Sequence, residues 1–563
     1  MISASSQTLL ASVLLGTEVF AAAVQARLSP RREPADGPWW DHGFGEHRAY
    51  PNSHGHGKYQ PGEWGRDEYH GWHWPNDEQG GDVGYNAYVD VPTTTPEHAC
   101  PPVDPDFIGF AFEEASLPRY VQNRDGSVNQ FSLNLIDAIM SRTGGKPIVR
   151  LGGTSADYGR FIPSQQAAAL PPSEVYNYQD LPMAHTNVSE SVLWAKTAAA
   201  GIGIERIDAF EPGNEADLYM DDYGDGALGP PYYQGTLTNE SYTGNFTKYV
   251  SAVKQALGIT EPQKCQAFDT AAHLGDDVLA NGYILDVQTN FELGINNGND
   301  IKQVAHHYYQ TDGGEYDDLG TGLMQHSAII ARLDLLRKFI TYLRDNHPRI
   351  PFIISEVGNS LNPTHSYDYQ ATLGSALWSV DFQLYSMSIG IARINWQQIM
   401  HSGFDMWLPV DSGNSSRRVF SNFYPMPLVA DFIGNTGSIR AVQLETGQDD
   451  IVAYAAYVEN EPVRVAIINL NIWDGSDGYP RPSTAFTLGV PIATKELRVD
   501  VLGSPHGAHA SGDSITYAGS QWTSASEGTE VTGVRNDSMT LKVEGGEANV
   551  VVHNSEAVLI HLL

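Results

Sequence analysis

Between residues 105 and 400, short apolar runs alternate with longer stretches in which apolar residues recur every three or four positions. This alternation of strand and helix patterns predicts repeated βα units around a parallel sheet, as in a (β/α)8 TIM barrel. Seven strand segments are recognisable, at 106–112, 147–151, 206–212, 264–271, 302–309, 351–356 and 391–397. The third strand is inferred only, because residues 155–205 contain a helix pattern near 189–201 and no clear strand.

Two amphipathic helices have readable ends. Residues 133–145, LNLIDAIMSRTGG, finish in a glycine pair that suits a left-handed cap, and the pattern over 328–348 finishes before a proline. Both helices are expected on the outside of the barrel, where their polar faces meet water.

After about residue 424 the pattern changes to alternation of apolar and polar residues. Segments such as 450–458, 463–470 and 496–502 are separated by Gly, Asp, Asn and Pro. This pattern predicts a C-terminal antiparallel β-sandwich, and we expect a strand near residue 90 to join it because a lone strand needs a backbone partner. The chain is therefore expected to divide into a leader (1–26), an irregular extension (27–90), the barrel (91–423) and the sandwich (424–563).

The N-terminal region indicates a secreted, extracellular glycoprotein. Residues 7–24 form an apolar stretch followed by small residues up to Ala26, which is typical of a secretory signal peptide. Five candidate N-glycosylation sites agree with a secretory route: Asn187, Asn239, Asn245, Asn414 and Asn536. Cys100 and Cys265 are the cysteines of the chain, and they form either one disulfide or two buried thiols.

The charge balance excludes whole classes of partner. Lys and Arg total 33 against 67 Asp and Glu, a formal charge of -34, which repels nucleic acids and anionic membrane surfaces. Residues 27–84 are rich in Gly, Trp and His, but the histidine spacing suits no particular metal ion, and we interpret the segment as a solvated extension. We expect neither a metal nor a cofactor.

The candidate chemistry lies at two strand ends. Glu215 follows the predicted strand 206–212 beyond a Pro-Gly turn, and Glu356 ends the strand 351–356. In a TIM barrel such positions face the active site, and a retaining glycosidase needs two carboxyl groups about 5–5.5 Å apart. Either glutamate alone could instead cap a helix or pair with a barrel arginine. The chain contains no HExxH motif, P-loop or GxSxG motif.

Five motifs and the sandwich that follows them resemble glycoside hydrolase family 79, which contains β-glucuronidases and heparanase-like enzymes. The motifs are FIGFAFEE, IVRLGGTSAD, FEPGNEADLY, HHYYQ and ISEVGNS, and the likeness covers about residues 95–563. The resemblance implies that Glu215 is the acid/base, that Glu356 is the nucleophile and that Asn214 binds the 2-hydroxyl of the sugar.

Further roles follow for residues near these motifs. Glu113 matches an acid that binds the outer sugar hydroxyls, with Glu114 as the alternative. Tyr308 is expected to donate to Glu356, with Tyr309 as its rival. Roles are also expected for Arg150, Trp396 and Gln397. Arg150 either lowers the pKa of the nucleophile or is a structural arginine, and Trp396, beside Gln397, either stacks under the sugar or packs in the core.

At one place the sequence departs from the family pattern, so the resemblance does not fix which sugar is cleaved. The glucuronidases of the family bind the substrate carboxylate through a Tyr and a Gly amide shortly after the nucleophile, whereas this chain has Leu361 and Pro363 there. Either a nearby group takes over that role, from Asn362, Thr364, His365, Ser366 or Tyr367, or the substrate is not a glucuronide. Three hypotheses stand: a retaining exo-β-glucuronidase acting on glucuronides or on glucuronate-capped side chains of extracellular glycans such as arabinogalactan, a retaining β-glycosidase for a neutral sugar, and a non-catalytic glycan-binding barrel protein.

Overall fold

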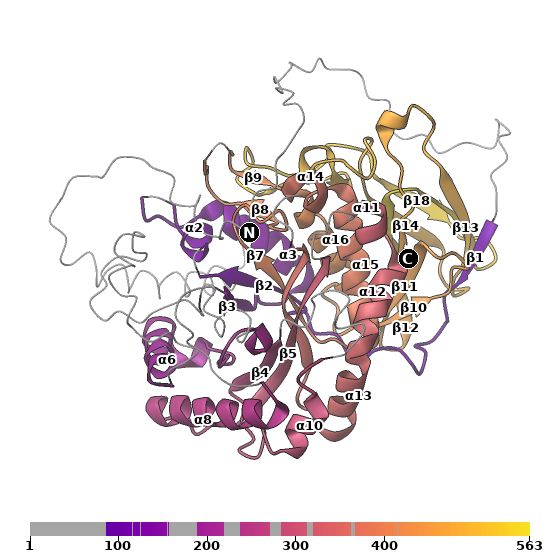
Figure 1. Ribbon diagram of the computed structural model, residues 1–563. Coiled ribbons are helices and arrows are strands. Elements are labelled where there is room, and N and C mark those ends of the chain that lie inside the picture. Colours follow the sequence, from indigo (N-terminus) through magenta and orange to yellow (C-terminus); the bar gives the residue numbers. More distant parts are fainter. Residues whose placement is uncertain are drawn as a thin grey trace.

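The structure is a computed structural model with a barrel-like α/β part and a β domain packed against it (Figure 1). It describes residues 86–114, 116–123, 125–154, 156, 188–218, 237–270, 283–311, 319–361, 366–413 and 415–563. The inferred third strand falls largely in 157–187, outside the described residues.

Six parallel strands form the sheet of the α/β part, in the order β3-β2-β7-β6-β5-β4. They are β2 (Ile108–Glu113), β3 (Val149–Gly152), β4 (Cys265–Thr270), β5 (Ile301–Thr311), β6 (Phe352–Ser360) and β7 (Ile394–Gln398). Most of their residues are buried, as expected for parallel strands covered by helices. The arrangement is a TIM-like half-barrel, which confirms the predicted fold class.

The expected strand 206–212 is much shorter than predicted. The 3-10 helix η3 (Ile204–Arg206) covers its first residue, and Phe210 alone forms a parallel bridge, to Cys265 of β4. Pro212 lacks an N–H, so it cannot donate to a ladder. The bridge nevertheless places the segment that leads to Glu215 along the edge of β4.

Helices surround the half-barrel strands. They are α2 (Leu117–Val121), α3 (Gln130–Thr143), α6 (Val188–Ile202), η4 (Ala216–Leu218), α8 (Asn239–Leu257), α10 (Val287–Glu292), α11 (Leu319–Gly322), α12 (His326–Leu333), η5 (Asp334–Leu336), α13 (Arg337–Asn346), α14 (Ser366–Gln370) and α15 (Leu373–Ile389). The glycine cap predicted for α3 is confirmed, since Gly144 follows it at φ 71°. The second predicted helix is divided into α12, η5 and α13.

The β domain is a sandwich of two sheets. One has the order β10-β11-β12-β20-β14-β15 with β18 also paired to β14, and the other has the order β1-β13-β19. Their bounds are β1 (Asn86–Asp90), β10 (Arg440–Leu444), β11 (Ile451–Val458), β12 (Glu461–Asn469), β13 (Ser483–Gly489), β14 (Glu496–Gly503), β15 (Thr516–Tyr517), β18 (Ser538–Lys542), β19 (Glu547–His553) and β20 (Glu556–Leu562). Smaller elements are β8 (Trp407–Leu408), β9 (Arg418–Val419), η6 (Ser421–Phe423), η7 (Gly475–Asp477), η8 (Gly512–Ser514), β16 (Gln521–Trp522) and β17 (Glu530–Val531). The strand expected near residue 90 does join this domain, because β1 pairs in parallel with β13 (Figure 1).

The boundary between the two parts lies later than residue 424. Helix α16 (Pro425–Ile433) packs against α3 and α15 of the α/β part, and β10 begins only at Arg440. Helix α15 is buried on nearly all sides, as befits a helix that contacts both the α/β part and the β domain. Among the described residues, no helix is both long enough and apolar enough to span a bilayer.

Of the two alternatives expected for Cys100 and Cys265, the structure shows two buried thiols and not a disulfide. Cys100 lies beside β10, where its sulfur accepts a hydrogen bond from the Ala441 amide, whereas Cys265 begins strand β4 of the half-barrel. Both are buried free thiols. Burial raises the pKa of Cys100 to about 11 and that of Cys265 to about 12, so neither is a reactive thiolate.

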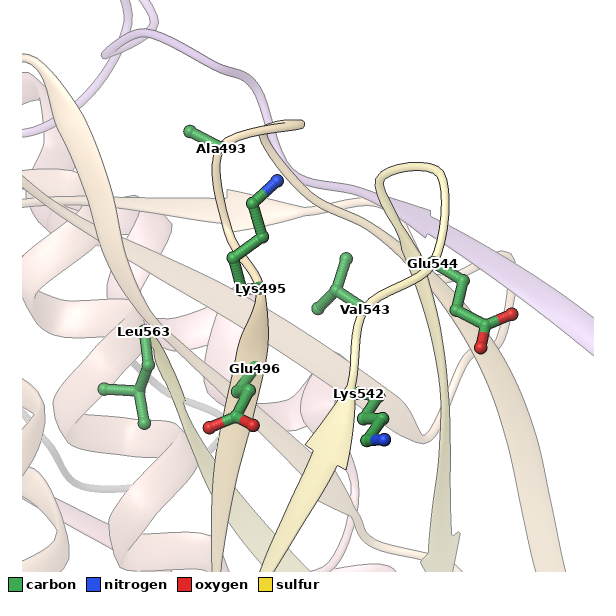
Figure 2. Close-up of a pocket in the computed structure, with 7 residues that line it drawn as sticks. All are labelled: Ala493, Lys495, Glu496, Lys542, Val543, Glu544 and Leu563. Carbon is green, nitrogen blue, oxygen red and sulfur yellow. The ribbon is translucent and has the colours of Figure 1, made fainter.

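A surface hollow of about 460 Å³ lies on the β domain, around the adjacent ends of β14 and β18. Its lining comprises Ala493, Lys495, Glu496, Lys542, Val543, Glu544 and Leu563 (Figure 2). It has no aromatic lining residue on which a sugar ring could stack, and it contains none of the predicted site residues.

Candidate active site

Most of the predicted site residues gather towards the C-terminal ends of the half-barrel strands. Glu113 ends β2, Arg150 lies in β3, Glu356 in β6 and Gln397 in β7. Asn214 and Glu215 follow the Phe210 bridge at the edge of β4. This end of the strands carries the active site in TIM barrels, so the fold brings together residues spread over about half of the chain.

Glu356 is a buried carboxylate held by two hydrogen-bond donors, with a histidine nearby. Arg150 Nη1 contacts its Oε2 at 2.5 Å, Tyr309 donates its hydroxyl to Oε1 at 2.8 Å, and His307 Nδ1 lies 4.0 Å from Oε2. Burial works to raise the pKa of Glu356, but the positive charges of His307 and Arg150 and the Tyr309 hydroxyl outweigh it, so the pKa lies below that of an ordinary glutamate. An ionised carboxylate in this place suits a nucleophile.

Glu215 faces Glu356 across a short gap. One oxygen of each carboxylate lies within 4.8 Å of the other and of a ring nitrogen of His307. His307 Nδ1 is 2.9 Å from Glu215 Oε1. The gap is close to the separation of about 5–5.5 Å that direct attack on an anomeric carbon requires, and shorter than the gap of about 6.5–9.5 Å that accommodates a water molecule in inverting enzymes.

Arg150 connects Glu356 to the residues around it. Its guanidinium makes a two-point contact with Glu211, through Nε at 2.8 Å and Nη2 at 2.5 Å, and Nη2 also donates to Asn214 Oδ1 at 2.7 Å. Fork-shaped contacts of this kind fix the guanidinium plane. Arg150 therefore holds Asn214, the predicted ligand of the sugar 2-hydroxyl, in fixed relation to Glu356.

Glu113 and Gln397 form a second polar pair at the same end of the sheet. Gln397 donates through Nε2 to Glu113 Oε2 at 3.0 Å, and both side chains are buried. A Cβ added to Gly153 would lie 2.0 Å from Glu113 Oε2, so a glycine is needed beside this carboxylate. Burial raises the pKa of Glu114, the alternative to Glu113, to about 6.

The expected contact between Tyr308 and Glu356 is wrong, and Tyr309 makes that contact. Successive side chains of a strand point to opposite faces, so His307 and Tyr309 share the face of β5 that carries the site. Tyr308 points the other way, donates to Gln310 and packs on Phe382 of α15.

Trp396 does not form the floor of the sugar site. Its ring packs edge-on against Trp378 and Phe382 of α15, at centroid distances of 6.0 Å in both cases. It precedes Gln397 in β7, and because Gln397 faces the site, its neighbour must face the helices. Trp396 is therefore a core residue, which was the other of the two expected roles.

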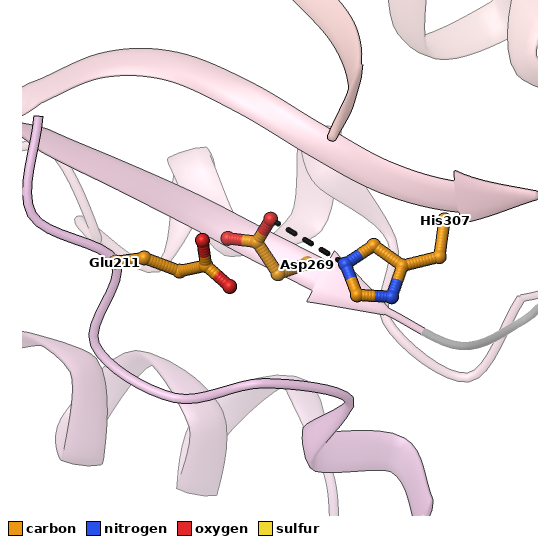
Figure 3. Close-up of side chains that lie close together, drawn as sticks. All are labelled: Glu211, Asp269 and His307. Carbon is orange, nitrogen blue, oxygen red and sulfur yellow. Dashed lines mark ion pairs between the residues drawn. The ribbon is translucent and has the colours of Figure 1, made fainter. Parts of the chain in front are cut away.

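Three residues that sequence reasoning missed complete the site: Glu211, Asp269 and His307 (Figure 3). His307 Nε2 lies 3.8 Å from Asp269 Oδ1. Burial works to lower the pKa of His307, but the charge of Glu356 and the contacts with Asp269 and Glu215 outweigh it and raise the pKa to about 10. Burial raises the pKa of Glu211 to about 7, against the opposing charge of Arg150. Each residue lies at or near the end of a predicted strand, which was the available signal.

In the described part of the chain, two groups of donor atoms have the dimensions of a metal site: Glu211, Asp269 and His307, and Glu215, His307 and Glu356. Arg150, however, contacts a carboxylate of each group at 2.5 Å. A fixed guanidinium at this distance repels a cation and already satisfies the oxygens that would bind it. The donor set therefore suits proton transfer and nucleophilic attack better than metal binding.

The chain is similar to known glycoside hydrolases over much of its length. Residues 453–559 match the model of the glycosyl hydrolase family 79 C-terminal beta domain. The chain is 25% identical over 444 residues to a β-glucuronidase of Aspergillus niger, covering 72% of this chain and 80% of that protein. It is 24% identical over 478 residues to a β-glucuronidase of Neurospora crassa, covering 73% of this chain and 84% of that protein.

Solved structures show the same fold. A 4-O-α-L-rhamnosyl-β-D-glucuronidase from Fusarium oxysporum superimposes with a TM-score of 0.65 at 18% identity, covering 85% of this chain and all of that chain (100%). An arabinofuranosidase of family GH51 from Xanthomonas axonopodis pv. citri superimposes with a TM-score of 0.53 at 14% identity, covering 85% of this chain and 99% of that one.

Proposed function

Because this chain is a glycoside hydrolase of family 79, we propose that it hydrolyses β-glucuronides with retention of configuration at the anomeric carbon. Glu356 is the nucleophile and Glu215 is the acid/base. The observation that carries this proposal is the pair of facing carboxylates, with oxygens within 4.8 Å and with different neighbours.

In the first step, Glu356 attacks the anomeric carbon while the bond from that carbon to the leaving oxygen breaks. The bonding electron pair stays on the leaving oxygen, which takes the proton of Glu215. Arg150 and Tyr309 keep Glu356 ionised before the attack, and Asn214, fixed by Arg150, holds the sugar 2-hydroxyl.

In the second step, Glu215 removes a proton from water as the water oxygen bonds to the anomeric carbon. The ester bond to Glu356 breaks, and its electron pair returns to the carboxylate. Once Glu356 is esterified it carries no charge, so a negative Glu215 is no longer repelled by its neighbour and can act as base.

The β-glucuronide substrate is supported by the two curated relatives, both of which are β-glucuronidases. One observation favours a neutral sugar as the second candidate. Leu361, at the position of a carboxylate-binding tyrosine in the family, is 37% exposed, and the hydroxyl of nearby Tyr367 already donates to Asp405 at 3.2 Å. The other neighbours named above, residues 362–365, lie outside the described residues.

The experiment compares chromogenic β-glucuronide, β-glucoside and β-galactoside, followed by labelling with cyclophellitol-type inhibitors in glucuronate and glucose forms. We expect the glucuronide to be preferred, the label to map to Glu356, and the first sugar released to be the β-anomer by proton NMR. The Glu356→Ala variant should lose at least about a thousandfold in activity. A label on another residue, or an α-anomer as first product, would disprove the double displacement. Preference for a neutral glycoside would move the substrate to the second candidate.

Secretion and attack on terminal residues of extracellular glycans belong to the same proposal. The signal-like segment 7–24 supports secretion, and so do the exposed side chains of Asn245 and Asn536. Asn239 is half-buried, with its amide oxygen accepting from the Asp286 amide at 2.8 Å. Asn187 and Asn414 lie outside the described residues. Sequencing the N-terminus of protein collected from culture medium, with and without glycosidase treatment, tests this part.

A further inference from the structure

Asp269 approaches Glu215 at both ends of that residue, through a backbone hydrogen bond at one end and across the ring of His307 at the other. The Glu215 amide donates to the Asp269 carbonyl at 2.8 Å. At the other end, Glu215 Oε1 lies 2.9 Å from His307 Nδ1, and His307 Nε2 lies 3.8 Å from Asp269 Oδ1, across the gap drawn in Figure 3. Backbone and carboxylate of one residue thus act on the same acid/base.

The backbone at this place is strained. Phe268, Asp269 and Glu215 have φ values of 84°, 39° and 46°, in the left-handed region that non-glycine residues rarely adopt. Each such conformation costs on the order of 1–3 kcal/mol and persists only where the surroundings impose it. The ladder between β4 and β5 is irregular between Phe268 and Thr270, and the Phe268 amide donates to the Tyr242 hydroxyl at 2.6 Å. The irregularity exposes the Asp269 carbonyl to Glu215.

The Asp269 carboxylate is itself fixed. It is 2% exposed, and Oδ1 accepts from Gln266 Nε2 at 2.5 Å and from Ser355 Oγ at 2.6 Å. A carboxylate beside Nε2 favours a proton on that nitrogen, as in other buried carboxylate–histidine pairs. Because the pKa of His307 is raised to about 10, Nδ1 carries a proton as well and donates a hydrogen bond to Glu215 Oε1.

We propose that Asp269 is a positioning residue for the acid/base, which orients the Glu215 carboxyl group through the fixed ring of His307 and the Glu215 amide through its own carbonyl. The inference rests on the proposed function, since it presupposes that Glu215 protonates the leaving group. Asp269 contacts no substrate and takes no proton in either step. Its effect is confined to how well Glu215 reaches the leaving oxygen.

The test is the Asp269→Asn variant with a series of aryl glycosides that differ in the pKa of the leaving phenol, on whichever sugar the unaltered protein hydrolyses. General acid catalysis contributes about 10²–10⁴-fold for a poor leaving group and little for a good one. We expect kcat/KM to fall at least about tenfold with unsubstituted phenol and to stay within about threefold with 2,4-dinitrophenol. A uniform loss over the series, or no loss, overturns the inference.

Asp500→Asn is a matched control in the β domain. Asp500 is also a buried strand aspartate beside a histidine and a serine, with His561 Nε2 at 3.1 Å and Ser538 Oγ at 2.7 Å. It should leave the leaving-group dependence unchanged, and a change equal to that of Asp269→Asn overturns the inference. Should Asp269→Asn fail to fold, Ser355→Ala removes one donor to the same carboxylate and should change the dependence in the same direction by a smaller factor.

A second readout needs no turnover and separates this inference from the proposed function. In protein labelled with ¹⁵N-histidine, the ring of His307 should show a protonated Nε2 that exchanges slowly, and Asp269→Asn should abolish or shift that signal. An unshifted signal overturns the role of Asp269. A shifted signal in a protein that hydrolyses no glycoside of the panel overturns the proposed function instead, and with it the catalytic meaning of the contact.

Discussion

Replacing Tyr309 by Phe removes one hydroxyl from the nucleophile and leaves the ring in place. The hydroxyl donates to Glu356 Oε1 at 2.8 Å, and both residues are buried. A hydrogen bond to a charged group contributes about 1.5–3 kcal/mol. Since one pKa unit corresponds to about 1.4 kcal/mol, the pKa of Glu356 should rise by about 1–2 units.

The direction of the pH effect follows from the role of Glu356. Its pKa is lowered in the folded protein, and the nucleophile must be ionised, so activity is lost as pH falls through that pKa. Tyr309→Phe removes one of the lowering causes. The acid limb of kcat/KM against pH should therefore move to higher pH by about 1–2 units.

The neighbouring residue supplies the control. Tyr308 is equally buried, but its hydroxyl donates to Gln310 and its ring packs on α15. Tyr308→Phe should leave the acid limb where it is, whatever it does to stability. Initial rates measured from about pH 3 to pH 8 decide the matter. Equal profiles for the two variants, or an acid limb unmoved by Tyr309→Phe, would refute the assignment of this tyrosine.

Three further predictions follow from the packing. Arg150→Met leaves the carboxylates of Glu211 and Glu356 buried without their cation. Denaturant titration should therefore show that the free energy of unfolding falls by about 3–5 kcal/mol. A fall of less than about 1 kcal/mol would contradict the contact of Arg150 with both carboxylates. Trp396→Phe should lower the melting temperature and leave KM unchanged, whereas a sugar-stacking role would raise KM. Burial works to lower the pKa of His326, but the charge of Asp381 outweighs it and raises the pKa above 6.5. The stability from this pair should therefore be complete below about pH 6.5 and lost as pH rises through the raised value, so His326→Gln should cost more in melting temperature at pH 5 than at pH 9.

Periodicity in the sequence predicted the strands because the apolar runs are long enough to be recognised without tertiary context. The run 302–309 became β5 (Ile301–Thr311), and 351–356 became β6 (Phe352–Ser360). The segment 206–212 failed because only Phe210 bridges to a neighbouring strand. Glu215 nevertheless reaches the site, since one bridge is enough to direct the turn that follows.

The face of the sheet on which each residue lies was harder to predict than the position of the strand in the sequence. In HHYY, His306 and Tyr308 lie on one face of β5, and His307 and Tyr309 lie on the other. The register between β5 and β6 also shifts between His306 and His307. Counting from Glu356 therefore cannot decide which tyrosine meets it. Trp396 and Gln397 are a different case, because adjacent residues of a strand cannot both face the site, and that rule alone would have removed one of them.

The opposite roles that we propose for Glu215 and Glu356 depend on which carboxylates the two cationic side chains of the site contact. The site brings together five carboxylates and two cationic side chains: Glu113, Glu211, Glu215, Asp269, Glu356, Arg150 and His307. Arg150 is bound to Glu211 and to the nucleophile, and His307 lies between the nucleophile and the acid/base. Neither cation is left to meet a carboxylate on the substrate. Recognition of a glucuronate must therefore depend on donors outside this group. We expect substitutions in the segment after β6, which contains Leu361, to change the sugar specificity.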